Sequence, residues 1–253
     1  MSMKLDYLKH NNVLLGENVV IGHGTILYPN VVIGDNTIIG PYSTIGEPTH
    51  SFYTQNSGNL KKHNFKKTTI GSNSIVRSHS IIYEDVHLGD GFQSGHRVTI
   101  RENSVFGKNC SVGTLSDIQG RVSIGNFVRL HSNVHIGQLS IIEDYAWIFP
   151  YVILTNDQYP PMDDLCGVTI KEYAVIATAS VLLPGIIIGK NALVGAHSVV
   201  TKNVSDEMLV LGNPAKVRCS VREVKDKDGN PVYPWRDYLK ENRGYPWQIK
   251  GEE

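Results

Sequence analysis

Aliphatic residues recur at every sixth position along most of this chain, and mainly polar or small residues fill the positions between them. These anchor positions form three runs, at residues 15–45, 70–154 and 170–200. Of the fifteen anchors in the second run, only Ser94 is not apolar. A period of six matches neither an α-helix nor a simple alternating strand. It predicts short strands joined by turns.

A small or β-branched residue stands four positions after most anchors, as at Thr25, Thr37, Ser80 and Ser198. We expect the anchor to point inward, its two neighbours to point outward, and the small residue to fill a corner. Glycine and asparagine suit the turns. Strands this short cannot bury an apolar face alone, so the coils must stack into a solenoid. A sandwich of strands with drifting spacing is the alternative.

Two segments interrupt the repeat, at residues 47–67 and 156–168, and both are predicted to be inserted loops. Loops on a rigid scaffold are where function concentrates, although a solvated excursion is the alternative for the first. Residues 219–253 form a tail, in which "RDYLKENR" is a predicted helical stretch. Its aromatic residues are predicted to pack onto the body or a neighbouring subunit: Tyr233, Trp235, Tyr245 and Trp247.

The bulk composition excludes several classes of partner. The 253 residues include 24 Lys+Arg and 24 Asp+Glu, so no field of one sign exists to attract nucleic acid or a membrane surface. Three scattered cysteines predict neither a disulfide framework nor a metal site, and they favour a reducing cytoplasm. Neither a secretion signal nor an 18-residue apolar stretch is present, so we expect a cytoplasmic protein without a membrane partner.

The repeat resembles the left-handed parallel β-helix of the hexapeptide-repeat acyltransferases, whose coils have three faces and 18 residues. The resemblance covers about residues 13–218 and leaves residues 1–12 as a lead-in. It supplies the left hand, because connection rules alone favour the opposite hand. It implies an all-β fold and a homotrimer with active sites between subunits.

Coils of 18 residues would place outward side chains that are 18 apart about one strand spacing, 4.8 Å, from each other. Asp117 would then stack on His135, with Gln119 on the same face and His131 on the adjacent one. An imidazole can accept a proton near neutral pH, and a carboxylate can orient it. We expect His135 or His131 to accept the proton of an acceptor amine, while Asp117, Gln119 and Asn156 orient that acceptor.

Two alternatives to this catalytic interpretation stay open. The same residues can be surface ladders in a subunit interface. The thiolate that leaves coenzyme A can also take the proton, so the chemistry does not strictly require a side-chain base.

Residues 181–218 resemble the closing coils of CoA-dependent members of this family, which implies acetyl-CoA as the donor and no metal. Ala177 and Gly195, 18 positions apart, predict a column of minimal side chains against which a pantetheine arm can lie. The resemblance implies that Asn213 and Pro214 border the nucleotide of CoA. It also makes three cations candidates for contacts with the CoA phosphates: Lys202, Lys216 and Arg218. A plain solenoid cap is the alternative.

Six blocks occur in the order "GEPTHSFY", "GHRVTIRE", "VGTLSDIQG", "LHSNVHIGQ", "WIFPYVILTND" and "VYPWR". Together they resemble the dTDP-3-amino-3,6-dideoxyhexose N-acetyltransferases, which make acetamido sugars for bacterial surface glycans such as lipopolysaccharide or S-layer glycan. The resemblance implies direct attack of a nucleotide-linked sugar amine on the thioester. Substrate contacts are then expected from Gln119, Arg97, Arg101, Glu84 and Tyr53.

The sequence leaves the nucleotide base and the position of the amine open. It also leaves the acyl length open, since His197 replaces the small residue more usual in the closing coils. Two other classes also stay open. A γ-class carbonic anhydrase would use the same β-helix with three zinc-bound histidines, and a non-enzymatic scaffold would not bind acetyl-CoA.

Overall fold

The computed structural model describes residues 7–161 and 163–238 of the chain. Short strands, most of them two residues long, wind around one axis and form three sheets, called A, B and C here. Apart from the last strands of sheet C, neighbouring strands in each sheet are parallel, and each pairs with the strand three further along the chain, so one turn contributes one strand to every sheet. The predicted left-handed parallel β-helix is confirmed.

Sheet A contains β1 (Leu8–Lys9), β4 (Ile26–Leu27), β7 (Thr44–Glu47), β10 (Ile81–Tyr83), β13 (Thr99–Ile100), β16 (Asp117–Ile118), β19 (His135–Ile136), β22 (Ile153–Leu154), β25 (Val181–Leu182) and β28 (Val199–Val200). Sheet B contains β2 (Leu14–Leu15), β5 (Val31–Ile33), β8 (Thr68–Ile70), β11 (His87–Leu88), β14 (Val105–Phe106), β17 (Ser123–Ile124), β20 (Ile141–Ile142), β23 (Thr169–Ile170) and β26 (Ile187–Ile188).

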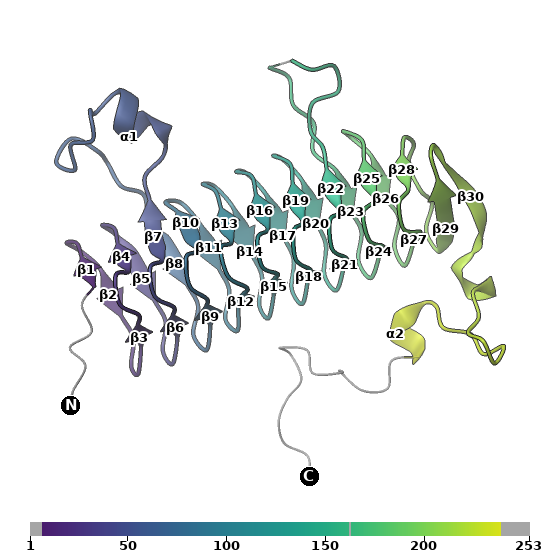
Figure 1. Ribbon diagram of the computed structural model, residues 1–253, viewed down its shortest axis with the longest axis horizontal. Coiled ribbons are helices and arrows are strands. Elements are labelled where there is room, and N and C mark those ends of the chain that lie inside the picture. Colours follow the sequence, from purple (N-terminus) through teal and green to yellow (C-terminus); the bar gives the residue numbers. More distant parts are fainter. Residues whose placement is uncertain (1–6, 162, 239–253) are drawn as a thin grey trace, which may run out of the picture.

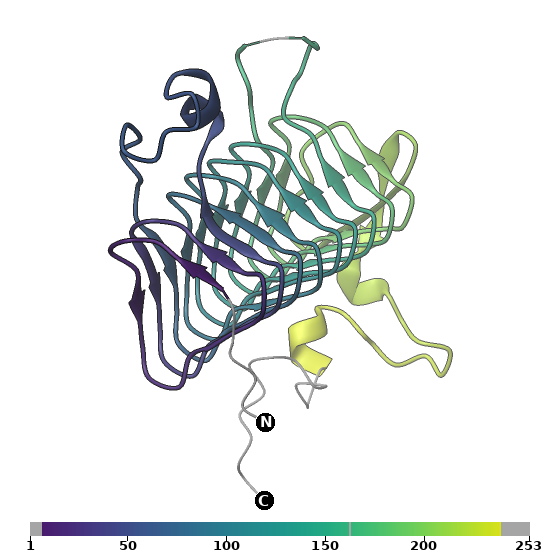
Figure 2. The same ribbon diagram turned by 60° about the vertical axis from the view of Figure 1, so that its left-hand side comes forward.

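Sheet C contains β3 (Val20–Ile21), β6 (Ile38–Ile39), β9 (Ile75–Val76), β12 (Gln93–Ser94), β15 (Ser111–Val112), β18 (Arg129–Leu130), β21 (Trp147–Ile148), β24 (Val175–Ile176), β27 (Leu193–Val194), β29 (Met208–Gly212) and β30 (Ala215–Ser220). The last two strands form an antiparallel hairpin. Two short helices, α1 (His50–Thr54) and α2 (Trp235–Tyr238), lie outside the coils, and a single 3-10 turn covers Val221–Glu223. Figure 1 shows the stacked coils from the side, and Figure 2 shows them turned.

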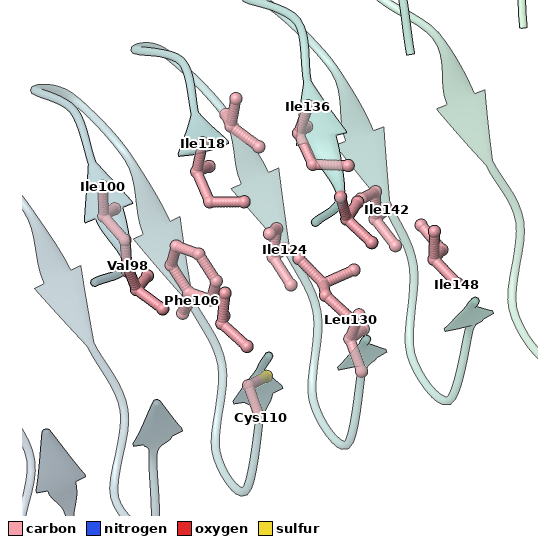
Figure 3. Packing of buried hydrophobic residues seen from close by; sticks show 14 of the residues in the cluster. Val98, Ile100, Phe106, Cys110, Ile118, Ile124, Leu130, Ile136, Ile142 and Ile148 are labelled. Carbon is pink, nitrogen blue, oxygen red and sulfur yellow. The ribbon is translucent and has the colours of Figure 1, made fainter. Parts of the chain in front are cut away.

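The core is a dry column built from the anchors of all three sheets. Ile100, Ile118 and Ile136 from sheet A are fully buried, and they lie in line along the axis (Figure 3). The small residues at the corners, such as Ser80 and Ser198, are fully buried too. The predicted inward anchors and filled corners are therefore confirmed.

At Ser94 and Phe92 the usual side-chain sizes are reversed: the anchor position holds a small residue and the corner position holds a large one. Ser94 stands at an anchor, is buried, and accepts a hydrogen bond from the backbone N–H of Arg77 at 2.9 Å. Phe92 stands at a corner where small residues are usual, and it packs edge-on against Phe106 with ring centres 5.6 Å apart. Because the large and small side chains trade places, the volume of the core is conserved.

Nearly every corner contains one residue with a left-handed backbone, three positions after the anchor. Asparagine or glycine often occupies this position, as the turn chemistry predicts. Bulky residues also occupy it, including Leu115 with φ of 62° and Tyr145 with φ of 60°. Tyr145 stacks on Phe127 and Tyr173 in neighbouring coils, at 4.8 and 4.9 Å between ring centres. The register of the coils thus overrides local preference.

The tail folds back onto sheet C. Val221 is fully buried against Val175 and Leu193, and Tyr233 packs on the same cluster. The Trp235 indole donates a hydrogen bond to the carbonyl of Tyr173 at 3.0 Å. The predicted packing is confirmed for Tyr233 and Trp235, whereas Tyr245 and Trp247 lie outside the described residues.

The two helices are short. Helix α2 covers only the start of the predicted "RDYLKENR" stretch, whose remainder falls outside the described residues. In the described part of the chain, no helix has the length and apolar character needed to cross a membrane.

Both insertions leave the solenoid from the same edge of sheet A, after β7 and after β22, and they project to the same side (Figure 1). The first insertion is not merely a solvated excursion, because two of its own residues, Phe52 and Phe65, are buried, at 5% and 6% exposure. The coils that carry β10, β13, β16 and β19 lie between the two insertions (Figure 1).

The left-handed corners give a test of the fold. Leu115→Asn should raise the free energy of unfolding by about 0.5–1 kcal/mol, because asparagine tolerates the left-handed backbone that strains leucine. Leu115 is 52% exposed, so little packing is lost. Val105→Asn is the control, since Val105 is 48% exposed but lies in β14. We expect it to be neutral or destabilising in denaturant titrations. Equal effects at both positions would contradict this account.

Candidate functional site

His135 and Asp117 form the pair that the spacing predicts. Strands β16 and β19 are neighbours in sheet A, and their register aligns Asp117 with His135. The His135 Nδ1 atom lies 3.1 Å from Asp117 Oδ2, and the side chains are 41% and 42% exposed. The predicted stacking is confirmed, while its catalytic role stays a prediction. The pair is open to a ligand approaching from solvent.

The Asp117 carboxylate is held in one orientation by two neighbours. In addition to its contact with His135, its Oδ2 atom accepts a hydrogen bond from Gln119 Nε2 at 2.9 Å. The contact with His135 and then that with Gln119 lower the pKa of Asp117, although burial opposes them. An ionised Asp117 keeps the proton of a neutral His135 on Nδ1 and leaves Nε2 as the basic nitrogen.

A second column on sheet A runs beside this pair. Tyr83, Arg101, Gln119 and Gly137 follow one another at 18-residue intervals in adjacent coils. Arg101 lies over the Tyr83 ring at 5.6 Å and forms a bidentate ion pair with Glu102 at 3.1 and 3.0 Å. We call this row the sheet A column.

Asn156 lies at the far end of the sheet A column. A Cβ atom on Gly137 would come within 3.2 Å of the Asn156 Cβ, so Gly137 leaves room for that side chain. Gln119 is one coil away. The structure therefore brings together His135, Asp117, Gln119 and Asn156, as the sequence predicted.

The first insertion reaches the other end of the sheet A column. Glu47 pairs with Tyr83 where β7 meets β10, and the Tyr53 hydroxyl donates to Glu47 Oε1 at 2.7 Å. Burial raises the pKa of Glu47, and the hydrogen bond to Glu47 raises the pKa of Tyr53. Tyr53 is 53% exposed. Sequence reasoning missed Glu47, although it stands at the point where the six-residue register stops.

His131 lies in a different environment from His135. The Trp147 indole donates to its Nε2 atom at 2.7 Å, and the imidazole stacks on Phe149 with ring centres 4.8 Å apart. Burial, and then the neighbouring Arg129, lower the pKa of His131 to about 4. Its acceptor nitrogen is therefore occupied and weakly basic. This environment favours His135 over His131 as the candidate base, and the identity of the base stays a prediction.

Glu84 contacts the first insertion in this structure, and it lines a cavity of about 530 Å³ there together with Thr49, His63 and Lys66, so its expected contact with a substrate stays a prediction. Its side chain is almost completely buried, with 3% of the residue exposed. Both carboxylate oxygens accept hydrogen bonds from the first insertion. The first insertion covers the corner after β10 and so buries the Glu84 side chain. The six-residue pattern does not predict this burial.

Arg97 and Arg101 lie on opposite sides of β13. Arg97 occupies the corner between sheets C and A, with a left-handed backbone and an exposed side chain. Arg101 directly follows β13, at the edge of sheet A from which the insertions leave. Only Arg101 therefore joins the sheet A column.

The predicted CoA residues gather at the opposite end of the solenoid from β1. Lys202, Pro214 and Lys216 line one cavity of about 320 Å³ beside the β29–β30 hairpin. Arg218 follows in β30 at the point where the register with β29 shifts, and it is not among the residues that line this cavity. Asn213 is exposed at the tip of the hairpin.

Ala177 and Gly195 are aligned in adjacent coils, as predicted. A Cβ atom on Gly195 would come within 2.9 Å of the Leu211 Cβ. Glycine is therefore needed at position 195, and Leu211 forms one wall beside this column.

Metal-ligating groups do not converge on any of these regions. Within residues 7–161 and 163–238, no three His, Cys, Asp or Glu side chains are grouped so that they could hold a metal ion.

Two known families of repeats match segments of this chain. The family described as "Bacterial transferase hexapeptide (six repeats)" matches residues 12–47, and "Hexapeptide repeat of succinyl-transferase" matches residues 185–204. The galactoside O-acetyltransferase of Escherichia coli is 31% identical over 133 residues, which cover 44% of this chain and 63% of the relative.

A shorter match is closer in sequence. The dTDP-3-amino-3,6-dideoxy-alpha-D-galactopyranose 3-N-acetyltransferase of Aneurinibacillus thermoaerophilus is 43% identical over 58 residues, 23% of this chain and 30% of the relative. The chain thus spans less than two thirds of either relative. An Arabidopsis UDP-N-acetylglucosamine acyltransferase structure has a TM-score of 0.60 at 16% identity, covering 87% of this chain and 74% of that one. It shows the same fold.

The environment of His131 predicts how stability depends on pH. The folded chain resists protonation of His131 down to about pH 4, whereas the unfolded chain takes up the proton near the ordinary pKa of 6.5. Stability should therefore fall as the pH drops through this window. His131→Gln keeps an acceptor for Trp147 but cannot be protonated. Its loss of melting temperature between about pH 7.5 and about pH 5 should be smaller than that of the wild type. Equal losses, measured by circular dichroism, would contradict this role.

Proposed function

Since the chain belongs to the hexapeptide-repeat family of bacterial transferases, we propose that it transfers an acetyl group from acetyl-CoA to the amino group of a nucleotide-linked amino sugar. The favoured acceptor is a dTDP-linked 3-amino-3,6-dideoxyhexose. The observation that carries the proposal is the open His135–Asp117 pair between the two insertions. The acetyltransferase from Aneurinibacillus supports the choice of acceptor, through its name and its 43% identity over 58 residues.

The proposed reaction is direct attack of a neutral amine on the thioester carbonyl. The nitrogen forms a bond to the carbonyl carbon, the carbon–sulfur bond then breaks, and the sulfur leaves as the thiolate of coenzyme A. His135 Nε2 accepts the proton that the amine loses and passes it to the thiolate, so the products are the amide and free coenzyme A. Asp117 keeps the imidazole oriented and stabilises its charged form.

The dimensions of the sheet A column suit an extended nucleoside diphosphate sugar. Four coil spacings separate Glu47 from Gly137, which is about 19 Å. In this proposal the sugar lies near Gln119 and Asn156, the pyrophosphate lies near Arg101, and the base lies beside Tyr53. Arg101 supplies the positive charge, and an aromatic side chain supplies a stacking face.

Acetyl-CoA is proposed to approach from the end of the solenoid that carries β29 and β30. Lys202 and Lys216, at the 320 Å³ cavity, would contact its phosphates, and the pantetheine arm would follow Ala177 and Gly195 toward His135. A homotrimer with sites between subunits is part of the proposal. The neighbouring subunit would then close the open side of the sheet A column.

A second acceptor class follows from the longer match. The Escherichia coli relative is a galactoside O-acetyltransferase, and it aligns over 133 residues. A sugar hydroxyl would need the same base and the same donor, so the site chemistry suits both acceptors.

The acceptor is tested by measuring the thiol released from acetyl-CoA in the presence of single acceptors. The panel contains dTDP- and UDP-linked amino sugars, the same nucleotides without an amine, and simple galactosides. We expect the fastest release with a dTDP-linked amino sugar. Release only with galactosides would favour the hydroxyl acceptor, and no release with any acceptor would reject the proposed activity.

The proposed base predicts a specific loss of turnover. His135→Gln should lower kcat by about 100-fold and change KM for acetyl-CoA by less than about twofold, because the proton acceptor is lost but the donor site is not. His87→Gln is a matched control, because His87 also faces outward from a strand and contacts Thr69 Oγ1 at 2.9 Å through Nδ1, but lies in sheet B. Turnover within about twofold of wild type for His135→Gln would assign the proton to the thiolate instead.

A further inference from the structure

Glu84 joins both ends of the first insertion to the solenoid. Its Oε1 atom accepts hydrogen bonds from the backbone N–H of Thr49 at 3.1 Å and from His63 Nε2 at 2.7 Å. Its Oε2 atom accepts one from the backbone N–H of Lys66 at 3.0 Å. Thr49 lies at the start of the insertion and Lys66 near its end. One buried carboxylate therefore fixes the spacing between the two stems.

Burying a carboxylate is unfavourable unless donors surround it. Here three donors meet two oxygens, and all three come from the insertion. Removing the charge would leave backbone N–H groups buried without a full partner. The arrangement therefore strongly favours one position of the stems over all others.

His63 connects this carboxylate to the small core of the insertion. Asn56 Nδ2 lies 3.2 Å from His63 Nδ1, which places the ring proton on Nε2, facing Glu84. The imidazole packs edge-on against Phe65, with ring centres 4.5 Å apart, and against Phe52 at 5.4 Å. The carboxylate, the imidazole and the two phenyl rings thus form one packed unit.

The same unit holds the residues at one end of the sheet A column. The backbone N–H of Glu84 donates to the carbonyl of Glu47 at 2.9 Å. Tyr53, carried by α1 between the two stems, donates its hydroxyl to the Glu47 carboxylate. Glu47 in turn pairs with Tyr83. Glu84 therefore acts on Tyr53 and Glu47 from outside the sheet A column.

We propose that Glu84 is a positioning residue for the acceptor, which it serves by holding the first insertion so that Tyr53 and Glu47 complete the nucleotide end of the sheet A column. The inference rests on the proposed function. It predicts that Glu84 controls the affinity for the acceptor and leaves the donor site and the chemical step at His135 unchanged, because those lie in other coils.

The test is Glu84→Gln, which keeps the shape of the side chain but turns an amide NH2 toward N–H donors. KM for the nucleotide-linked amino sugar should rise at least tenfold. The value of kcat at saturating acceptor and KM for acetyl-CoA should each change by less than twofold. Glu143→Gln is the matched control, because Glu143 also accepts a backbone N–H, from Glu172 at 3.2 Å, but it follows β20 in sheet B and contacts the coil after the second insertion instead of the first insertion. It should behave like the wild type.

Limited trypsin digestion gives a readout that does not need activity. Lys61 and Lys62 are exposed in the insertion, and Glu84→Gln should be cut there at least fivefold faster than wild type. If this variant does not fold, Thr49→Pro replaces it. That change removes one N–H donor at a φ of −71°, which proline adopts. The same rise in acceptor KM and in cleavage is expected.

The outcomes separate the two proposals. An unchanged acceptor KM together with unchanged cleavage overturns the role of Glu84, even if the enzyme acetylates amino sugars. A parallel rise in KM for both substrates, or a loss of kcat, also overturns it, because the effect would then be general. A wild type that acetylates nothing rejects the proposed function instead, whatever the cleavage rate.

Discussion

The structure depends on the pairing of each strand with its equivalent in the next coil, which lies 18 residues further on except where an insertion intervenes. Every coil uses its backbone N–H and C=O groups to bind the coils before and after it, so equivalent side chains stack in columns. A shift of one residue would turn the buried anchors outward, and the apolar column therefore maintains the register. The contact between His135 and Asp117 follows directly, because no insertion separates β16 from β19. The rigid columns are also what makes a row of surface groups usable as an elongated site.

Where the register is interrupted, other interactions replace the strand ladder. The first insertion is held by a buried carboxylate and by its own aromatic core, and the tail is held by Trp235 and by the cluster around Val221. Such interactions are specific to their partners, since a buried charge tolerates few alternative arrangements. The solenoid thus supplies a uniform frame, and its two insertions give one edge of sheet A a distinct chemistry. The proposed acceptor groove lies along that edge.

The six-residue period was enough to predict the anchors, the corners and the stacking of Asp117 on His135, because these depend only on spacing. It failed where neighbours lie diagonally or come from outside the repeat. Trp147 contacts His131 from 16 residues away, so it is invisible to a search at intervals of 18. Glu84 is buried by residues of the first insertion, which have no period. Arg97 and Arg101 are only four residues apart, but Arg97 lies in the corner before β13 and Arg101 follows that strand, so they flank it at opposite ends.

The sequence by itself determined the solenoid, its period, the positions of its interruptions and the columns of its surface. It could do so because a local pattern repeated along the chain encodes both the turn and the buried residue of each coil. Only the tertiary structure decided that His131 is packed against Trp147 and Phe149 while His135 stays open, and that the first insertion buries Glu84. Those properties depend on burial and on hydrogen-bond partners that arrive from distant parts of the chain, and the free energy of a charged or polar side chain is set by these surroundings.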